Sequence, residues 1–403
     1  MKASIGIIGG GPAGMMAAIR AAETLGDGSR VVLFDKNERL GRKIYLTGKG
    51  RCNLTNTRPW EDFSTHLYPD KGFLRFAFRA FSNEAVIRFF EEDLGVPTVT
   101  LQGQRVYPAS LAAGDVARAL EQHVRKLGVE VRYDSAVGSL SELSDFAAVI
   151  VATGGKSYPV TGSTGDGYHL AQEAGHTVTT VFPSETALLP QDYDPALPGL
   201  EIKNAGLHLY VDRTLVQSEQ GDFNFTNDGL ESGIAYHLSR RAVWALYNGQ
   251  RVDVVLDLKP ALTEEQLVNR LQRTSQLSPE VSAVNRHSRL DRESLRSFLP
   301  ESLMAPFRRA HPDLTFDNLP SALKAWPFRI IDYKGFERAV VTAGGVSLKE
   351  IVPKTMASRL REGLYFCGEV LDLDGDTGGY NLQIAFSTGA LAGTSAAKYL
   401  LSL

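Results

Sequence analysis

Ser4-Ile5-Gly6-Ile7-Ile8-Gly9-Gly10-Gly11-Pro12-Ala13-Gly14 is the stretch that decides the fold. Its apolar first half has the composition of a buried parallel strand, and its glycines fit the pattern G-x-G-x-x-G. An alanine-rich segment with helical character follows, and a second apolar run over 31–34 ends in Asp35. The order strand, glycine turn, helix, strand and acid predicts a dinucleotide-binding βαβ unit, because each part has a separate physical role.

Those roles can be assigned to single residues. Gly9 makes the tight turn, Gly11 lets the backbone approach a pyrophosphate, and Gly14 permits close packing of helix on strand. The phosphates then bind to the free N–H groups at the positive end of the helix. Asp35 can accept hydrogen bonds from both hydroxyls of an adenosine ribose and would repel a 2′-phosphate.

The composition is that of a globular protein with more than one domain. The chain has 403 residues, a hydrophobic content of 43%, a charged content of 22% and a net charge of -3. This charge gives no bulk electrostatic reason to bind nucleic acid, and no apolar run approaches the roughly 20 residues that span a bilayer. Because only Cys52 and Cys367 are present, we expect no disulfide framework and a cytoplasmic location. We also expect no metal site, since the acids over 372–376 lack the spacing of a calcium loop.

Two polar segments follow Asp35. The basic segment over 36–43 is either a solvated loop or, because it follows the ribose-binding acid, a source of a cation for the pyrophosphate, from Arg42 or Lys43 after Gly41. The next segment, Thr47-Gly48-Lys49-Gly50-Arg51-Cys52-Asn53-Leu54-Thr55-Asn56, has the glycines, cations and amides of a loop that wraps a polar ligand. Cys52 beside Arg51 allows a redox thiol, but without a C-x-x-C partner a packed thiol is favoured.

Further candidate motifs lie at the ends of later strands. The predicted strand over 146–151 ends in Ala152-Thr153-Gly154-Gly155, and the one at 364–366 leads to Gly368-Glu369. Gly375-Asp376-Thr377-Gly378-Gly379-Tyr380-Asn381-Leu382-Gln383 then opens a helix rich in small residues, whose N-terminus offers N–H donors to an anionic group. The glycines at 162–167 do not have the G-x-G-x-x-G spacing. A second, built-in NAD(P)H site is therefore not expected.

These motifs, with Thr342-Ala343-Gly344-Gly345-Val346, resemble the signature of a bacterial FAD-binding flavoprotein family. The family includes aminoacetone oxidase and a bile-acid dehydro-intermediate reductase, and the resemblance covers most of the chain. It implies that Glu369 holds a ribityl hydroxyl and that the helix after Gly379 faces the N1–C2=O2 edge of the flavin. Similarity to two-dinucleotide-fold flavoenzymes implies that Val137 meets the adenine through its backbone.

This chain departs from the family pattern at two positions. The family usually carries Phe-Thr-His-x-Gly-x-Ser-Gly-Pro where this chain has Phe225-Thr226-Asn227 and, further on, Ile234 in place of the proline. If the family histidine performs acid–base chemistry, this protein lacks that step or uses another group.

The predicted fold is an α/β, glutathione-reductase-like FAD domain of the two-dinucleotide-binding type. It is discontinuous, over 1–188 and 340–403, with an inserted substrate or cap domain over 189–339. The insertion is expected to be β-rich over 189–260 and 326–339 and helical over 262–325, with a capping box at Thr263-Glu264-Glu265-Gln266. Its basic stretch over 286–309 lacks the interleaved aromatics that stack on bases, which favours a solvated face or subunit interface over an RNA surface.

The predicted function is that of an FAD-dependent oxidoreductase with a small organic substrate. Hydride passes to or from the flavin, with oxygen or transiently bound NAD(P)H as the electron partner. A tRNA-modifying flavoprotein and a non-catalytic FAD-binding regulator are the alternatives. The catalytic candidates are Lys49, Arg51, Asn53 and Tyr380. The residues expected to bind the cofactor are Gly9, Gly11, Pro12, Ala13, Gly14, Asp35, Lys36, Arg42, Lys43, Thr47, Gly48, Asn53, Val137, Thr153, Gly154, Gly155, Gly368, Glu369, Gly378, Gly379, Tyr380, Asn381 and Leu382.

Overall fold

The computed structural model describes residues 4–274 and 295–403 and divides the chain into two compact units. Unit 1 consists of Met1–Pro183 together with Phe336–Leu403, and unit 2 is Ser184–Gly335. The sequence placed the corresponding boundaries at 188 and 340. In the described ranges no helix is both long enough and apolar enough to cross a bilayer.

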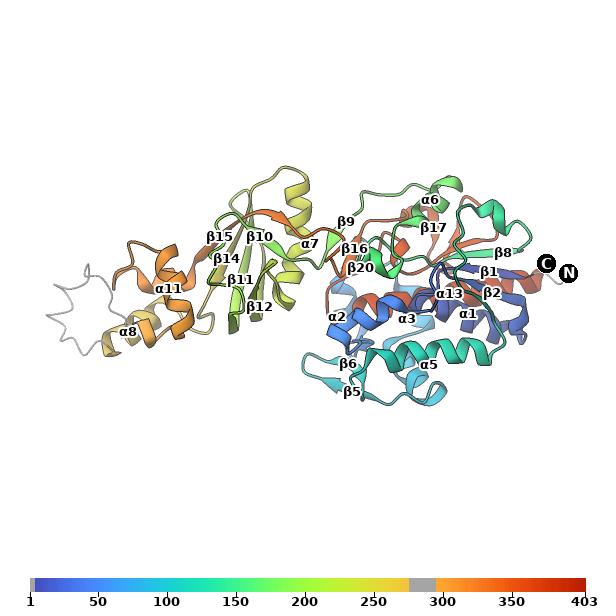
Figure 1. Cartoon of the computed structure of the whole chain (residues 1–403), viewed down its shortest axis with the longest axis horizontal. Helices are drawn as coiled ribbons and strands as arrows, with labels where there is room; N and C mark the ends of the chain where they lie inside the picture. Colours follow the sequence, from blue (N-terminus) through green and yellow to red (C-terminus); the bar gives the residue numbers. More distant parts are fainter. Residues whose placement is uncertain (1–3, 275–294) are drawn as a thin grey trace. The chain divides into compact units, whose positions relative to one another are not determined.

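Unit 1 is built on a seven-stranded sheet (Figure 1). In spatial order its strands are β17 (Ile351–Val352), β18 (Ala357–Ser358), β19 (Leu364–Phe366), β8 (Ala148–Val151), β1 (Ile5–Ile8), β2 (Val31–Phe34) and β7 (Glu130–Arg132). The five strands from β19 to β7 are mutually parallel, and β1 lies between β8 and β2. β1, β2 and β8 are buried throughout, which explains their continuous apolar runs.

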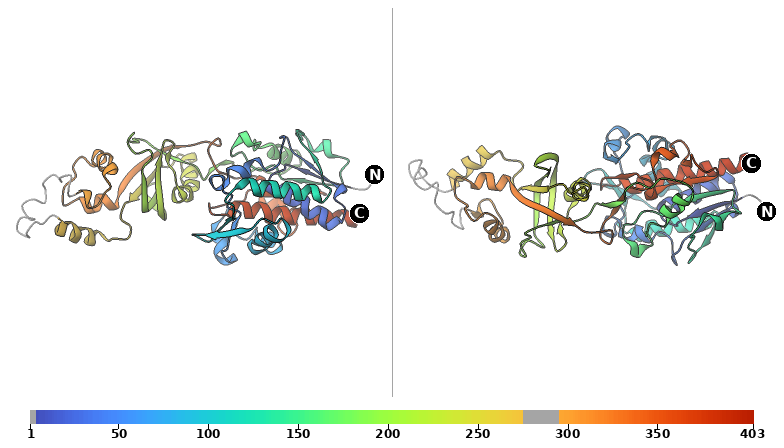
Figure 2. Two further views of the ribbon diagram at one scale, coloured as in Figure 1. Left: turned by 60° about the horizontal axis from the view of Figure 1, so that its bottom comes forward. Right: turned by 90° about the horizontal axis from the view of Figure 1, so that it is seen from above.

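Two helices pack closely on each other beside this sheet, α1 (Pro12–Leu25) and α13 (Tyr380–Ser402) (Figures 1 and 2). Glycines allow the approach: a Cβ on Gly389 would stand 2.3 Å from the carbonyl oxygen of Ala13, and one on Gly393 would stand 2.1 Å from that of Ala17. The chain therefore brings its first and last helices together by backbone contact. The other helices of unit 1 are α2 (Trp60–Phe63), α3 (Arg75–Ala80), α4 (Asn83–Arg88), α5 (Ala113–Lys126) and α6 (Asp166–Glu173).

Three small sheets complete unit 1. β20 (Asp374–Gly375) pairs antiparallel with β4 (Leu67–Tyr68), and so joins the segment before α13 to the segment after α2. The remaining pairs are β16 (Val341–Ala343) with β9 (Phe182–Ser184), and the order β3 (Thr55–Asn56), β6 (Arg105–Pro108), β5 (Thr98–Leu101).

Unit 2 is a closed six-stranded barrel with accompanying helices. The barrel order is β10 (Leu188–Pro190), β13 (Gly229–Leu230), β12 (Thr214–Thr226), β11 (Glu201–Val211), β14 (Val252–Asp257) and β15 (Trp326–Tyr333). The helices are α7 (Gly233–Tyr247), α8 (Glu264–Thr274), α11 (Glu301–Ala310) and α12 (Leu319–Lys324). Closure removes the open edges that a sheet of this size would otherwise expose.

Helix α7 lies inside the stretch that the sequence predicted as β-rich. The hydroxyl of Ser232 caps it by accepting a hydrogen bond from the Ala235 N–H at 3.2 Å, and its apolar residues pack on β12 and β11. The capping box before α8 is confirmed: the side chains of Thr263 and Gln266 each bond the backbone N–H of the other. Residues 286–294 of the predicted basic helix lie outside the described residues.

Candidate functional site

The carboxyl ends of four adjacent parallel strands bring the predicted motifs to one edge of the unit 1 sheet. Gly9 follows β1, Asp35 follows β2, Thr153 follows β8 after one residue, and Gly368 follows β19 after one residue. Neighbouring strands lie about 4.8 Å apart, so this row extends across roughly 14 Å. Segments from both ends of the chain thus meet where doubly wound α/β folds bind their ligands.

The three fingerprint glycines differ in what surrounds them. A Cβ on Gly14 would stand 1.8 Å from the carbonyl oxygen of Gly9, and one on Gly9 would stand 2.6 Å from that of Ala152. Packing therefore requires both of these glycines. A Cβ on Gly11 would meet nothing within 4 Å, and its φ of -74° suits any residue. Nothing in the described protein explains a glycine there, whereas a ligand lying against the backbone would.

The N-terminus of α1 has the features of an anion-binding helix end. Gly11 is the N-cap residue and Pro12 opens the helix, and no side chain caps the free N–H groups. The first turn also contains no acidic residue. The N–H groups of Ala13 and Gly14 and the positive end of the helix dipole are therefore available to a phosphate.

Asp35 is buried at the end of β2, with an exposed fraction of 8%. Its Oδ2 accepts a hydrogen bond from the Gly10 N–H at 2.7 Å, and its Oδ1 accepts from the backbone and side chain of Asn37, each at 2.8 Å. These three donors fix the carboxylate beside the glycine turn. Each oxygen can still accept a further bond, so the geometry is compatible with a ribose diol.

The three cations predicted to bind the cofactor all have protein partners. Lys36 bonds Thr164 and forms an ion pair with Asp166, and Arg42 donates to Asn37 Oδ1 at 2.7 Å. Lys43 Nζ lies 2.8 Å from Glu369 Oε2. Lys36 and Lys43 are thus charge-compensated within the protein, a feature that the sequence did not predict.

Glu369 links three segments at the β19 end of the row. Besides Lys43, it accepts a hydrogen bond from the Thr342 N–H at 2.8 Å. The Thr342 hydroxyl in turn accepts from the N–H groups of Lys156 and Ser157, at 2.8 and 3.0 Å. Thr342 therefore fastens the loop after Gly154-Gly155 to the Gly368-Glu369 turn. Gly155 permits this, since a Cβ there would lie 2.5 Å from Thr342 Oγ1.

The glycine loop at 47–53 is fixed to the start of α13 by Asn53. In the amide orientation that satisfies its neighbours, Asn53 donates to the carbonyls of Thr55 and Val106 and accepts from the Gly379 N–H at 2.9 Å. Both amide hydrogens are thereby occupied. The predicted catalytic residue Asn53 has the contacts of a positioning residue in this structure.

The other residues of this loop differ in their exposure and in their contacts. Cys52 is fully buried, and this burial raises the pKa of its thiol to about 12, so the packed-thiol interpretation fits the structure. The Thr47 hydroxyl donates to the Ile44 carbonyl at 2.6 Å. Gly48 has a φ of +58°. Lys49 and Arg51 are exposed, and the Arg51 guanidinium lies over the Tyr107 ring at 5.3 Å.

The N-terminus of α13, like that of α1, has no side-chain cap. Gly378 and Gly379 precede it with φ values of +127° and +94°. Asn381 closes the turn, because its side chain accepts from the Gly375 N–H at 2.9 Å and donates to the Gly375 carbonyl at 2.7 Å. Tyr380 is buried against Phe63, with ring centroids 4.8 Å apart, and burial raises the pKa of its hydroxyl. The adjacent Leu382 is half-buried.

Val137 and Thr153 are two further residues that were predicted to contact the cofactor. Val137 is buried, in the segment that follows β7. The Thr153 hydroxyl is buried and has no hydrogen-bond partner within the described part of the chain. Such an orphaned donor at the row of strand ends is consistent with a ligand there, although Gly167 also lies close to it, with its ideal Cβ 2.1 Å from the oxygen.

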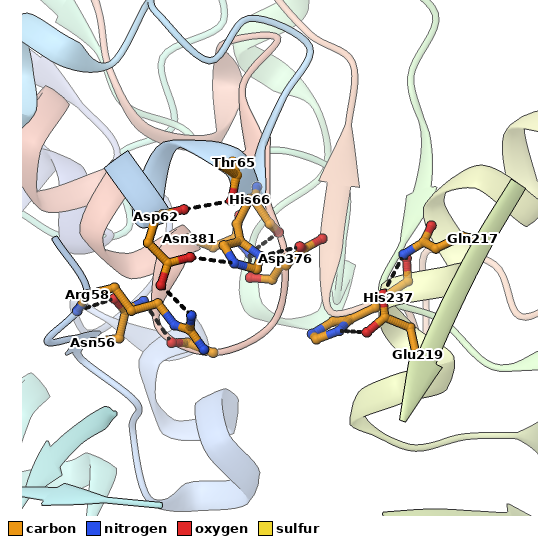
Figure 3. A network of polar contacts seen from close by, with 12 residues as sticks. Asn56, Arg58, Asp62, Thr65, His66, Gln217, Glu219, His237, Asp376 and Asn381 are labelled. Carbon is orange, nitrogen blue, oxygen red and sulfur yellow. Dashed lines mark hydrogen bonds and ion pairs between the residues drawn. The ribbon is translucent and has the colours of Figure 1, made fainter. Parts of the chain in front are cut away.

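A polar network beside α13 was missed from the sequence (Figure 3). His66 Nδ1 lies 2.8 Å from Asp376 Oδ2, and its Nε2 lies 3.6 Å from Asp62 Oδ1. Arg58 forms an ion pair with Asp62 at 2.6 Å. The four-residue spacing of Arg58, Asp62 and His66 was the available signal, and the motif that contains Asp376 was interpreted as a helix start without a partner for this acid.

Unit 2 contains its own carboxylate–imidazole pair. His237 Nδ1 lies 3.1 Å from Glu219 Oε2, and Gln217 donates to Glu219 Oε1 at 2.8 Å (Figure 3). Asn227, where the family pattern expects histidine, lies in the turn between β12 and β13, and Ile234 is the second residue of α7.

This donor set fits FAD. It comprises an uncapped helix N-terminus, an open glycine beside it, a buried acid at the end of the next strand, and a second glycine–acid pair across the sheet. The first three features match a pyrophosphate with an attached ribose. When bound, FAD supplies the hydride chemistry, while the protein provides orientation and electrostatics.

Comparison with known proteins gives the family. Residues 3–395 match the HI0933-like protein Rossmann domain, and the chain belongs to this family of FAD-binding flavoproteins. It is 32% identical over 98% of its length to the 3-dehydro-bile acid delta(4,6)-reductase of Clostridium scindens, of which 99% is covered. It is 28% identical to the ribosomal RNA dihydrouridine synthase of Haemophilus influenzae, with 95% of each chain covered. The protein is thus an FAD-dependent oxidoreductase, as the sequence predicted.

One solved structure supports the fold. The 3-ketosteroid delta1-dehydrogenase of Sterolibacterium denitrificans superposes with a TM-score of 0.52 at 11% identity, covering 98% of this chain and 99% of that chain. At this identity the likeness concerns the α/β Rossmann-type architecture alone.

Proposed function

We propose that this protein is an FAD-dependent reductase of a carbon–carbon double bond conjugated to a carbonyl in a small cyclic substrate. The observation that carries the FAD-dependent part is the open Gly11 at the uncapped end of α1, with the held carboxylate of Asp35 beside it. The reaction class is supported by the relatives. Both printed activities, a delta(4,6)-reductase and a dihydrouridine synthase, correspond to saturation of a ring double bond.

The division of labour between the units is part of this proposal. Unit 1 is the glutathione-reductase-like FAD domain, in which Gly11, Ala13 and Gly14 hold the pyrophosphate and Asp35 holds the ribose. Unit 2 is the inserted substrate domain. The support is that the FAD motifs fall in unit 1 from both ends of the chain, and that the barrel of unit 2 interrupts them. Lys43, Glu369 and Thr342 position the loops around the ribityl chain.

A second candidate substrate is uridine in RNA. The ribosomal RNA dihydrouridine synthases of Haemophilus influenzae and Escherichia coli, 28% and 29% identical over 95% of this chain, support it. The net charge of -3 favours the small substrate, because RNA binding draws most of its affinity from cationic contacts with phosphates.

The test is anaerobic stopped-flow flavin absorbance with separate half-reactions. The oxidised protein is mixed with NADH, NADPH or a small primary amine, and the reduced protein with a 3-dehydro bile acid carrying the delta(4,6) diene or with a uridine-containing RNA hairpin. We expect bleaching by a nicotinamide and recovery of the flavin colour with the dienone. Bleaching by the amine would overturn the reductase assignment in favour of an oxidase, and recovery with RNA alone would establish the second substrate.

A further inference from the structure

The network of Arg58, Asp62, His66 and Asp376 in unit 1 includes none of the residues assigned to FAD. We propose that His66 is the general acid that protonates the substrate, and that Asp376 is the positioning residue that orients it. This inference rests on the proposed reductase function, and it names the source of the proton that saturation of a double bond requires.

The contacts of the imidazole leave one nitrogen available. Asp376 Oδ2 lies 2.8 Å from Nδ1. In the proposed acid form the carboxylate accepts the Nδ1–H, and the proton on Nε2 is the one that is transferred to the substrate. Asp62 Oδ1 is 3.6 Å from Nε2, which is longer than a hydrogen bond. Arg58 pairs with the other oxygen of this carboxylate, Oδ2, at 2.6 Å. Among the described residues, Nε2 therefore has no hydrogen-bond partner.

Two groups hold the imidazole, the Asp376 carboxylate and the Tyr380 ring. The backbone of His66 is fixed as well, because its carbonyl accepts from the Asp376 N–H at 3.0 Å, next to the pairing of β4 with β20. The Tyr380 ring stacks on the imidazole with centroids 4.7 Å apart. The exposed fraction is 26% for the His66 side chain and 12% for Asp376. A nearly buried carboxylate thus orients a partly accessible imidazole, which is the arrangement of an acid–base histidine.

The position of His66 agrees with this role. Tyr380, on which it stacks, is the first residue of α13, and the turn from Asp376 to Gly379 leads into that helix. Asn56 donates to the Gly378 carbonyl at 3.1 Å and so fastens the same turn. The imidazole is therefore attached to the helix N-terminus that is expected to face the flavin.

Saturation of the double bond requires one hydride and one proton. FAD, when bound and reduced, would supply a hydride whose electron pair forms one C–H bond at the β-carbon of the conjugated system. The π electrons of the double bond would move to the α-carbon, take the proton from Nε2 of His66 and form the second C–H bond. His66 would become neutral, keep its Nδ1 proton on Asp376, and be reprotonated from water. The two electrons would come from a nicotinamide.

The first experiment separates the two half-reactions in His66→Gln, with Asp376→Asn alongside and His169→Gln, on the exposed face of α6, as the matched control. We expect full FAD loading and unchanged bleaching by the nicotinamide in all three variants. Reoxidation by the delta(4,6) dienone bile acid should slow on the order of 100- to 1,000-fold in His66→Gln, and less in Asp376→Asn. Equal slowing of both half-reactions, or unchanged reoxidation, would overturn the assignment.

Chemical rescue distinguishes proton transfer from a structural role. Added imidazole should restore part of the reoxidation rate of His66→Ala and leave His169→Ala unaffected. Failure of imidazole to restore any activity in a variant that loads FAD fully would contradict the proposal.

A readout that needs no turnover separates this inference from the proposed function. The side-chain nitrogen NMR signals of His66, assigned by their loss in His66→Gln, are followed in the oxidised holoprotein. The Nδ1-protonated form should predominate when the ring is neutral, and the dienone should shift the Nε2 signal. If the reduced protein fails to react with the dienone but the Nε2 signal still shifts, the reaction class is wrong and the site stands. If no shift occurs, the site assignment is wrong.

Discussion

Two helix N-termini in unit 1 invite comparison, since both lack a side-chain cap and both follow glycines. Gly11, before α1, has an ordinary backbone conformation and open space where a Cβ would be. Gly379, before α13, has a φ of +94°, and its Cβ would stand 2.4 Å from the Thr55 carbonyl carbon. Packing within the protein explains the second glycine but not the first, for which we propose a ligand.

This difference shows that a glycine motif can report two kinds of constraint. At Gly379 the chain folds back on β3 and needs a residue without a side chain in order to fold. At Gly11 the folded chain has room for a side chain, and under the proposed function the pyrophosphate of the cofactor excludes one. Substitutions at the two positions should therefore damage different properties.

The largest expected effect is loss of folding in Gly379→Val. The strained backbone conformation and the collision with Thr55 should together lower the free energy of unfolding of the apoprotein by more than about 3 kcal/mol. Thermal unfolding and soluble yield measure this. Gly11→Ala is the matched control and should change the stability of the apoprotein by less than about 1 kcal/mol. Equal destabilisation by the two substitutions would show that folding requires a glycine at both positions, and the proposed difference between Gly11 and Gly379 would be wrong.

The next largest effect is loss of the cofactor in Gly11→Val. The new side chain would occupy the space where the pyrophosphate approaches the backbone, so FAD affinity should fall more than about 100-fold, or about 3 kcal/mol. Visible absorbance of the purified protein and fluorescence titration of the apoprotein with FAD give the affinity. The unfolding temperature of the apoprotein should stay at that of the wild type. Full FAD occupancy in this variant would contradict the assignment of the glycine turn.

A smaller effect is expected for Asp35→Asn, which tests the buried acid beside the open glycine. The amide turns an N–H donor towards one of the donors that now bond the carboxylate, so the free energy of unfolding should fall by about 1–2 kcal/mol. FAD affinity should fall about 10-fold because a ribose acceptor is lost. Asn37→Ala separates the two effects, since it removes one donor to Asp35 and leaves the carboxylate. A wild-type FAD affinity in Asp35→Asn would contradict the ribose assignment.

The smallest effect concerns Cys52, in the glycine loop that Asn53 fastens to Gly379. Burial raises the pKa of the thiol from 9.0 to about 12, so the native thiol is protonated at neutral pH and should not react with a soluble disulfide reagent. Above about pH 9 the unfolded thiol ionises and the folded one does not, so stability should fall as the pH rises further. Cys52→Ser should make this decline less steep. Rapid labelling of Cys52 in the native protein would show that the loop is open.

Where its signals were local, the sequence predicted which segments lie together at the candidate site. The strand–glycine–helix order, Asp35 and the Gly368-Glu369 pair each follow from residues a few positions apart, and the fold places them at one sheet edge. The pairing of Lys43 with Glu369 joins residues 326 positions apart. Neither partner carries a local sign of the other, so their mutual neutralisation was not predictable.

Helix α7 shows a different limit. The helix lies between two strands of the barrel in the sequence, and Ser232 caps it. The alternating apolar and polar residues of the barrel strands led to a β-rich prediction for the whole stretch. Barrel closure depends on pairing between β10 and β15, which are far apart in the chain. A β-rich composition indicates strands, but it does not say whether the sheet closes.

By itself, the sequence determined that this protein is an FAD-binding flavoprotein with a Rossmann-type fold, because glycine turns and strand-end acids act through their immediate neighbours. Only the tertiary structure decided that Gly11 faces open space while Gly379 is locked by packing, and that His66 meets Asp376 beside α13. These distinctions depend on which distant backbone segment lies within a few ångströms of a residue, and no local pattern encodes that distance.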